Sequence, residues 1–264
     1  MQGRLSTPVL PDRLQFFQQD WYDEFILARQ LGFDSITWFL DRDIDDFDPI
    51  NDIWLKETIL SRIDQARIIT PINSIDCGKY PFFGPKSKNT INDFNLLIPV
   101  LSGRLSSATI CIPMLEENAP KSDREIDESQ QNIIQLVSLC KKSKIRIALE
   151  TEMSAPKLIE YLNVFDPSVV GICYDIGNCT SYGFDCPNEI NMLGKKIFEV
   201  HVKDRKIGGN QSMFLGKGDA DFDGCIKSLK NIMYTGMYTM QAWRGHDYIN
   251  DARSQLDFIK HKLM

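Results

Sequence analysis

Hydrophobic and polar positions along the chain alternate between two periods. Residues 145–149 form an almost unbroken apolar run, which is typical of a buried strand, whereas 129–142 carries apolar side chains at helical spacing. Read in this way, the pattern predicts strands over 1–5, 33–40, 68–75, 108–114, 145–149, 169–174, 197–202 and 237–242. It predicts helices over 21–31, 53–66, 91–101, 129–142, 156–165, 189–193, 222–233 and 248–263.

Each predicted strand is followed by a predicted helix. Such an alternation favours a parallel sheet, and eight units in about 250 residues fit a (β/α)8 TIM barrel. We therefore expect a single barrel domain over residues 1–264, since no linker, low-complexity block or short repeat interrupts the pattern. A doubly wound open sheet is the structural alternative, but no GxGxxG follows the first predicted strand.

Composition and charge narrow the classes of protein. The 264 residues are 43% hydrophobic and 25% charged, which is ordinary for a folded globular chain. The net charge is -6 with no basic stripe, so nucleic acid is not an expected partner. No apolar run is long enough to cross a bilayer, and residues 1–11 lack the apolar region of a signal peptide. The seven cysteines form no CxxC pair, so we expect reduced core thiols in a cytoplasmic protein.

Polar residues end the last four predicted strands. The strand over 145–149 is followed by Glu150, the next ends at Asp175, and the last two reach His201 and Gln241. Taken singly, an Asp before Gly-Asn is typical of a turn, and a His in a strand is typically a hydrogen-bonded core residue. Barrel strands, however, converge at their carboxyl ends, where active sites lie. Together the four side chains predict a site for one divalent metal ion: Mn²⁺, Mg²⁺, Co²⁺ or Zn²⁺.

Several short segments also resemble a known family. They are Met-Gln-Gly-Arg-Leu-Ser at 1–6, Leu-Gly-Phe-Asp-Ser-Ile-Thr-Trp at 31–38, Ile-Ala-Leu-Glu at 147–150, Tyr-Asp-Ile-Gly-Asn at 174–178, Val-His-Val-Lys-Asp at 200–204, Leu-Gly-Lys-Gly-Asp at 215–219 and Tyr-Thr-Met-Gln at 238–241. In order and spacing they resemble the sugar (phosphate) isomerase/epimerase members of the xylose-isomerase-like barrel superfamily. The resemblance covers nearly the whole chain.

The resemblance implies a divalent metal held by Glu, Asp, His and Glu, roles that would fall on Glu150, Asp175, His201 and Gln241. The last of these departs from the family pattern, because the usual residue is Glu. Thr37 also departs, at a position where many members have Glu. Asn178 stands where some epimerases have His, and we count it among the substrate-binding candidates.

The chemistry that the resemblance implies is proton transfer next to a metal-bound sugar carbonyl. Glu150 is the candidate general base, and Glu152, two residues further along, is a second candidate or a solvated loop residue. Gln241 can offer an amide oxygen to a metal but cannot take a proton. The ligand charge is therefore -2 instead of -3, which predicts weaker metal binding. It also predicts that two-base epimerisation through the fourth ligand is unavailable, so that proton transfer proceeds on one face.

Further residues are candidates for holding the substrate. Lys203 lies two residues past His201, where it could bind a developing oxyanion or a phosphate, or form a rim salt bridge. Asp204 follows it, and Arg4 ends the first predicted strand, where it could grip an anion or pair with an acidic neighbour. Trp38 and Trp243 could form an apolar wall against a sugar ring, or could be core and rim aromatics.

The sequence thus predicts a metal-dependent sugar or sugar-phosphate isomerase or epimerase. A dehydratase or other lyase acting on a polyol or keto-acid is the alternative within the same barrel. A catalytically degenerate sugar-binding barrel is the alternative of another class, motivated by Gln241, Thr37 and Asn178. Endonuclease-type barrels need many histidines, and the chain has three. The expected partners are a small-molecule sugar or sugar phosphate and, in a homodimer, a second copy of the chain, with neither nucleic acid nor membrane.

Overall fold

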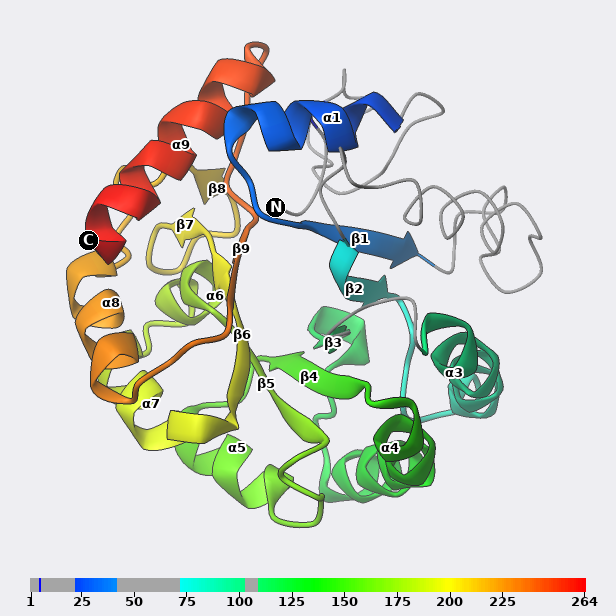
Figure 1. Ribbon diagram of the computed structural model, residues 1–264. Helices are drawn as coiled ribbons and strands as arrows, with labels where there is room; N and C mark the ends of the chain where they lie inside the picture. The colour runs from blue at the N-terminus through cyan, green and yellow to red at the C-terminus, as the bar shows by residue number, and fades with distance from the viewer. Residues whose placement is uncertain (1–4, 6–21, 42–71, 103–108) are drawn as a thin grey trace.

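The computed structural model describes residues 5, 22–41, 72–102 and 109–264. Seven parallel strands form one curved sheet in chain order, and the sheet nearly closes into a barrel (Figure 1). The strands are β1 Ile36–Asp41, β2 Ile72–Gly78, β3 Thr109–Met114, β4 Arg146–Thr151, β5 Val170–Asp175, β6 Ile197–Val202 and β9 Met237–Met240. The barrel prediction is confirmed. The strand predicted over 1–5, Leu5 apart, and the helix predicted over 53–66 lie outside the described residues.

Helices surround this sheet, and all but the shortest follow the predicted alternation. They are α1 Tyr22–Leu31, α3 Ser87–Leu101, α4 Asp123–Ser143, α5 Ala155–Leu162, α6 Ile176–Ser181, α7 Cys186–Leu193, α8 Phe222–Asn231 and α9 Tyr248–Leu263, with 3₁₀ turns at Glu116–Asn118 and Gly194–Lys196. Helix α6 was not predicted, nor was a small antiparallel ribbon of β7 (Asp204–Arg205) and β8 (Ser212–Met213).

Helix α4 begins six residues before the predicted start at 129, because a capping box sets its first turn. The Ser122 hydroxyl accepts the Glu125 backbone N–H at 3.3 Å, and the Glu125 carboxylate accepts the Ser122 N–H at 3.1 Å. This reciprocal pair satisfies donors that a helix start would otherwise leave without partners. The apolar periodicity alone detects only the later part of the helix, where Ile133, Leu136 and Cys140 are buried.

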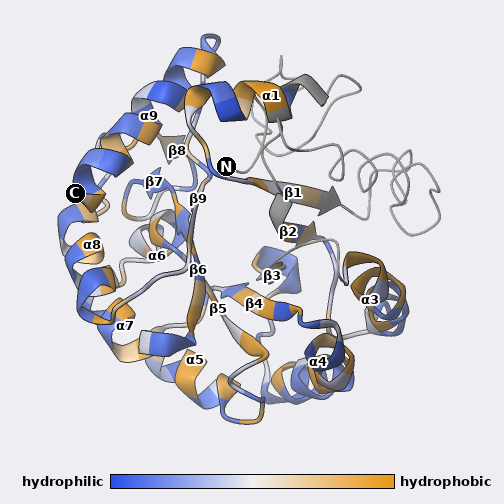
Figure 2. Ribbon diagram, viewed as in Figure 1, coloured by the Kyte–Doolittle hydropathy of each residue, from blue (hydrophilic) through white to orange (hydrophobic). Residues whose placement is uncertain are grey.

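Hydrophobic residues are spread over the strands and the helices (Figure 2), and the buried ones from both form one main core cluster. Trp38, Phe82 and Phe94 are among the largest fully buried side chains of this core. All seven cysteines are buried and free, as predicted. In the described part of the chain, no helix has the length and hydropathy that crossing a bilayer requires.

Candidate functional site: a buried metal-ligand cluster

Three of the predicted ligands lie together at the carboxyl end of the sheet. Glu150 is next to last in β4, Asp175 is the last residue of β5, and His201 is paired in register with Asp175 on β6. Glu150, Asp175 and His201 are 3%, 2% and 0% exposed, respectively. Gln241, also buried, follows β9, and its backbone N–H donates to the Val202 carbonyl at 3.0 Å. All four therefore stand on neighbouring strands at one end of the barrel.

The imidazole of His201 is the centre of this cluster. Its Nδ1 lies 3.4 Å from Glu150 Oε2 and 3.9 Å from Asp175 Oδ2. Both ring nitrogens are buried, and neither makes a hydrogen bond of good geometry. Ligand atoms about 2.0–2.2 Å from a shared metal lie roughly 3–3.5 Å from one another. The Glu150–His201 separation falls in this range, whereas Asp175 Oδ2, at 3.9 Å, would move closer to His201 to share the same divalent cation.

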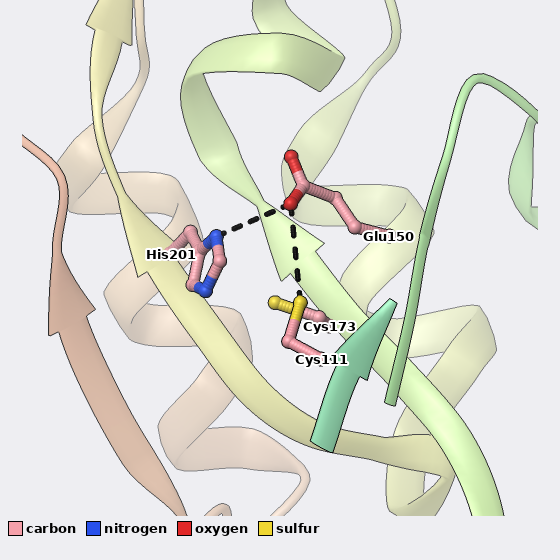
Figure 3. A group of neighbouring side chains, drawn as sticks. All are labelled: Cys111, Glu150, Cys173 and His201. Carbon is pink, nitrogen blue, oxygen red and sulfur yellow. Dashed lines mark hydrogen bonds and ion pairs between the residues drawn. The ribbon is translucent and has the colours of Figure 1, made fainter. Parts of the chain in front are cut away.

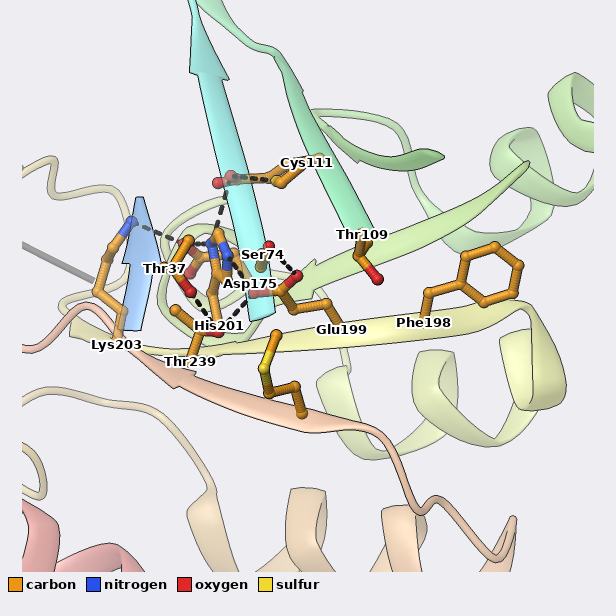
Figure 4. Close-up of polar contacts among 12 residues, drawn as sticks. Thr37, Ser74, Thr109, Cys111, Asp175, Phe198, Glu199, His201, Lys203 and Thr239 are labelled. Atoms are coloured by element: carbon orange, nitrogen blue, oxygen red, sulfur yellow. Dashed lines mark hydrogen bonds and ion pairs between the residues drawn. The ribbon is translucent and has the colours of Figure 1, made fainter. Parts of the chain in front are cut away.

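The opposite edge of the imidazole faces a carboxylate that the sequence analysis missed. Glu199 is fully buried on β6, and its Oε1 lies 3.5 Å from His201 Nε2 (Figure 4). The Ser74 hydroxyl donates to its other oxygen at 2.8 Å, and the Thr239 hydroxyl donates to Oε1. Thr37, the position that departs from the family pattern, contacts the Thr239 hydroxyl at 3.2 Å. Glu199 is thus held in place by hydroxyl groups from two other strands.

The carboxylates around His201 control its charge. Burial lowers the pKa of the imidazole, but contacts with Cys111, Glu150 and Glu199 outweigh burial and raise the pKa well above its usual value. Carboxylates on both edges of the ring create a strongly negative local field. A divalent cation beside Nδ1 would neutralise that field as effectively as a proton does.

The Asp-Ile-Gly-Asn segment at 175–178 begins the short helix α6. Asp175 caps α6 by accepting the Asn178 backbone N–H at 2.8 Å, while its Oδ2 lies 2.6 Å from Lys203 Nζ. The Asn178 amide donates to Glu150 Oε1 at 2.5 Å and accepts from Lys203 at 3.4 Å. At Gly177 a Cβ would lie 2.8 Å from the Lys203 stem, so glycine lets the lysine cross the helix.

The sequence left two interpretations of Lys203, a substrate-binding cation or a salt bridge. The structure shows a salt bridge, and its partner is Asp175. Burial raises the pKa of Asp175, but Lys203 and His201 outweigh burial and lower it overall. Asn178 links this ion pair to Glu150. Its amide orients the carboxylate that faces His201.

Asp204 organises a loop. Its carboxylate accepts the backbone N–H groups of Gly216 and Gly218 at 2.8 Å each and that of Ala220 at 3.2 Å. A Cβ at Gly218 would overlap that carboxylate, which accounts for the second glycine of Leu-Gly-Lys-Gly-Asp. The fully buried Asp204 thus places the loop that contains Lys217.

Of the other predicted site residues, Glu152, Trp38 and Trp243 make contacts of a different kind. The Glu152 carboxylate accepts the Glu116 backbone N–H and lines a cleft of about 800 Å³ between the loops after β3 and β4. Trp38 is 2% exposed and belongs to the main hydrophobic core, a position that favours a packing role. Trp243 is half-buried and packs edge-to-face on Phe214, with ring centroids 5.0 Å apart. Arg4 lies outside the described residues.

Two cysteines complete the cluster at its base. Cys111 of β3 and Cys173 of β5 are buried beside Glu150 and His201, and one potential ligand atom from each of the four residues lies within 4.8 Å of the others (Figure 3). Sequence reasoning treated these thiols as inert core residues. The missed signal was their place on strands flanking the one that carries Glu150.

The sequence profile of the xylose isomerase-like TIM barrel family matches residues 25–262. The chain belongs to this family. Among curated proteins, L-ribulose-5-phosphate 3-epimerase UlaE from Escherichia coli K12 is 20% identical over 260 residues, 92% of this chain and 90% of UlaE. UlaE from Escherichia coli O1:K1 is 26% identical over 134 residues, and that match spans about half of each chain (48% and 47%).

Solved structures share the fold of this xylose isomerase-like barrel. The xylose isomerase domain protein from Planctomyces limnophilus has a TM-score of 0.75 at 16% identity, covering 89% of this chain and 90% of that one. The IOLI protein with a bound zinc atom has a TM-score of 0.71 at 18% identity, covering 90% and 92%. At these identities the likeness establishes the fold alone.

Proposed function

We propose that this barrel is a divalent-metal-dependent isomerase or epimerase of a sugar or sugar phosphate. The observation that carries the proposal is the convergence of Glu150 and Asp175 on Nδ1 of the buried His201, at 3.4 and 3.9 Å. Gln241 provides the fourth ligand through its side-chain oxygen. The family relationship supports the substrate class, because UlaE, a curated relative, is a sugar-phosphate epimerase.

A divalent metal bound to these residues supplies a Lewis acid that stabilises negative charge on the sugar's carbonyl oxygen as the adjacent C–H bond ionises. Glu150 takes the proton from that carbon and returns it to the neighbouring one, while the hydroxyl proton of the first carbon passes to the former carbonyl oxygen. Asn178 steadies Glu150 through the 2.5 Å bond to Oε1, so that Oε2 stays on the His201 side. Lys203 neutralises Asp175, which reduces repulsion between the two carboxylates.

Gln241 sets the stereochemical outcome of this scheme. An amide cannot accept a proton in the working pH range, so the strand that carries the fourth family ligand offers no second base. Glu152 is bound to the loop after β3 through the Glu116 backbone N–H. We therefore propose proton transfer on one face of the substrate, which exchanges aldose and ketose without inverting a stereocentre.

The test is deuterium wash-in from heavy water, followed by proton NMR. The Mn²⁺-loaded protein is incubated with a panel of ketopentoses, ketohexoses and their terminal phosphates. We expect one or more of them to lose the proton signal next to the carbonyl and to yield the corresponding aldose. A product lighter by one water would instead indicate the dehydratase. No exchange across the panel by metal-loaded protein would contradict the proposal.

The proposal extends to the compartment, the partners and the domain organisation. Seven buried, free thiols fit a reducing compartment, so we propose the cytoplasm. We propose that residues 1–264 act as one barrel domain, with a small sugar as the partner and a homodimer as the assembly. Size-exclusion chromatography with light scattering measures the last of these directly.

A further inference from the structure

We propose that Cys111, Cys173, Glu150 and His201 form a second metal position, deeper in the barrel, that takes a thiophilic divalent ion such as Zn²⁺, Co²⁺ or Cd²⁺. It shares Glu150 and His201 with the ion of the proposed function, so the two positions exclude each other. Only this exclusion rests on the proposed function. The deeper position itself stands on its own donor atoms.

The two thiols come from strands on either side of Glu150. Cys111 lies on β3 and Cys173 on β5, and alternate strands of a barrel contribute side chains to one layer. Cys111 Sγ lies 4.0 Å from Glu150 Oε2, and the two sulfur atoms lie side by side below that carboxylate (Figure 3). Every residue of the group is at most 3% exposed.

The separations suit a tetrahedral ion. With metal–sulfur bonds of about 2.3 Å and metal–nitrogen or metal–oxygen bonds of about 2.0 Å, donor atoms lie roughly 3.3–3.8 Å apart. The observed separations are 3.4 Å between His201 Nδ1 and Glu150 Oε2, 4.0 Å between Cys111 Sγ and the same oxygen, and at most 4.8 Å within the group. Side-chain shifts of less than about 1 Å would bring the four donor atoms to the separations of a tetrahedral ion.

The donor chemistry separates the two positions. Thiolates select soft or borderline ions such as Zn²⁺, whereas carboxylate and amide oxygens suit Mg²⁺ and Mn²⁺. Asp175 lies outside the thiolate group, and its Oδ2 lies 2.6 Å from Lys203 Nζ. Each thiol releases its proton to solvent as its sulfur–metal bond forms.

The surroundings also favour an ion at this depth. Ala148 and Phe198 pack with the two cysteines in a small apolar cluster, which keeps the floor of the position dry. Metal–ligand attraction is stronger in such a low-dielectric setting than in water. Zn²⁺ bound there would hold Glu150 and His201 and exclude Mn²⁺ from the position above.

Cobalt spectroscopy tests the inference. Metal-free protein is titrated with Co²⁺, and we expect a thiolate-to-cobalt charge-transfer band in the near ultraviolet that saturates at one ion per chain. Adding Zn²⁺ should abolish the band by displacement. Cys111→Ser and Cys173→Ser should each weaken or remove the band and reduce Zn²⁺ affinity at least about tenfold. Cys140→Ser, a buried cysteine on α4, is the matched control and should keep both properties.

The outcomes separate this position from the proposed function. Co²⁺ binding without the band, or a band that survives in both site variants, would overturn the thiolate position. Mn²⁺ binding in a protein that shows no cobalt–thiolate band would overturn this position alone. Absence of both Mn²⁺ and Co²⁺ binding would overturn both proposals. The wild-type titration decides the matter even where a serine variant fails to fold.

Discussion

Glu199→Gln is the most informative single change outside the ligands, because it alters what faces His201 without touching a ligand atom. The Glu199 carboxylate lies 3.5 Å from Nε2 and is held by hydroxyls of Ser74 and Thr239. When an ion is bound, a carboxylate there keeps the remaining proton on Nε2, which leaves the lone pair of Nδ1 for the ion held with Glu150 and Asp175. Glutamine keeps the shape but loses the charge. We therefore expect weaker metal binding.

The structure bounds the size of the effect. Two unit charges 3.5 Å apart attract by about 5 kcal/mol at an effective dielectric constant of about 20, an upper limit for a fully charged ring. Removing a carboxylate that orients a metal-binding histidine typically costs 10–100-fold in affinity, which is about 1.4–2.7 kcal/mol. We expect a loss of about that size for Mn²⁺.

The assay is competition for Mn²⁺ against a fluorescent chelator. Glu189→Gln is the matched control, because Glu189 is also buried but accepts hydrogen bonds from Ala155 and Tyr174 on the outer side of the barrel. Both variants are first checked for folding by circular dichroism. Equal Mn²⁺ affinity in wild type and Glu199→Gln would refute the orienting role. An equal loss in both variants would reduce the effect to general destabilisation.

Three further predictions concern the ligands, the base and the buried thiols. Gln241→Glu should tighten Mn²⁺ binding, because it restores a third negative ligand charge; unchanged or weaker binding in a chelator titration would remove Gln241 from the metal. Glu150→Gln should slow deuterium wash-in by about 10²–10⁴-fold, and near-normal exchange would move the base elsewhere. Burial raises the pKa of Cys140 from 9.0 to about 12, so its thiol ionises in the unfolded chain first. Between pH 9 and 12, urea unfolding should show wild type losing up to about 1.4 kcal/mol per pH unit more than Cys140→Ala, and parallel curves would contradict this.

The fold was predictable because the parallel strands are buried on both faces. Apolar or alternating segments predicted the seven strands of the barrel sheet, and the polar residues at the ends of three of them identified Glu150, Asp175 and His201. Strand ends in a parallel barrel share one rim, so chain order alone brought these three side chains together. That part of the site needed no knowledge of side-chain contacts.

Contacts that depend on register and loop path were not predictable in the same way. Glu199 stands two residues before His201 on one strand, which is a readable signal for a shared face. A register shift just before Glu199, however, leaves Phe198 opposite no residue of β5. Helix α6 is six residues long and entirely buried, so it has no amphipathic pattern to detect. The partners of Asp204 lie 12 to 16 residues away in a loop.

Metal analysis of purified protein tests the central claim most directly. The chain has three histidines, and His261, exposed in the last turn of α9, is a matched control for His201. After equilibration with Mn²⁺ and removal of free ion, the account predicts one ion per chain in wild type and in His261→Ala, and loss of the ion in His201→Ala. Equal metal content in all three proteins would contradict it.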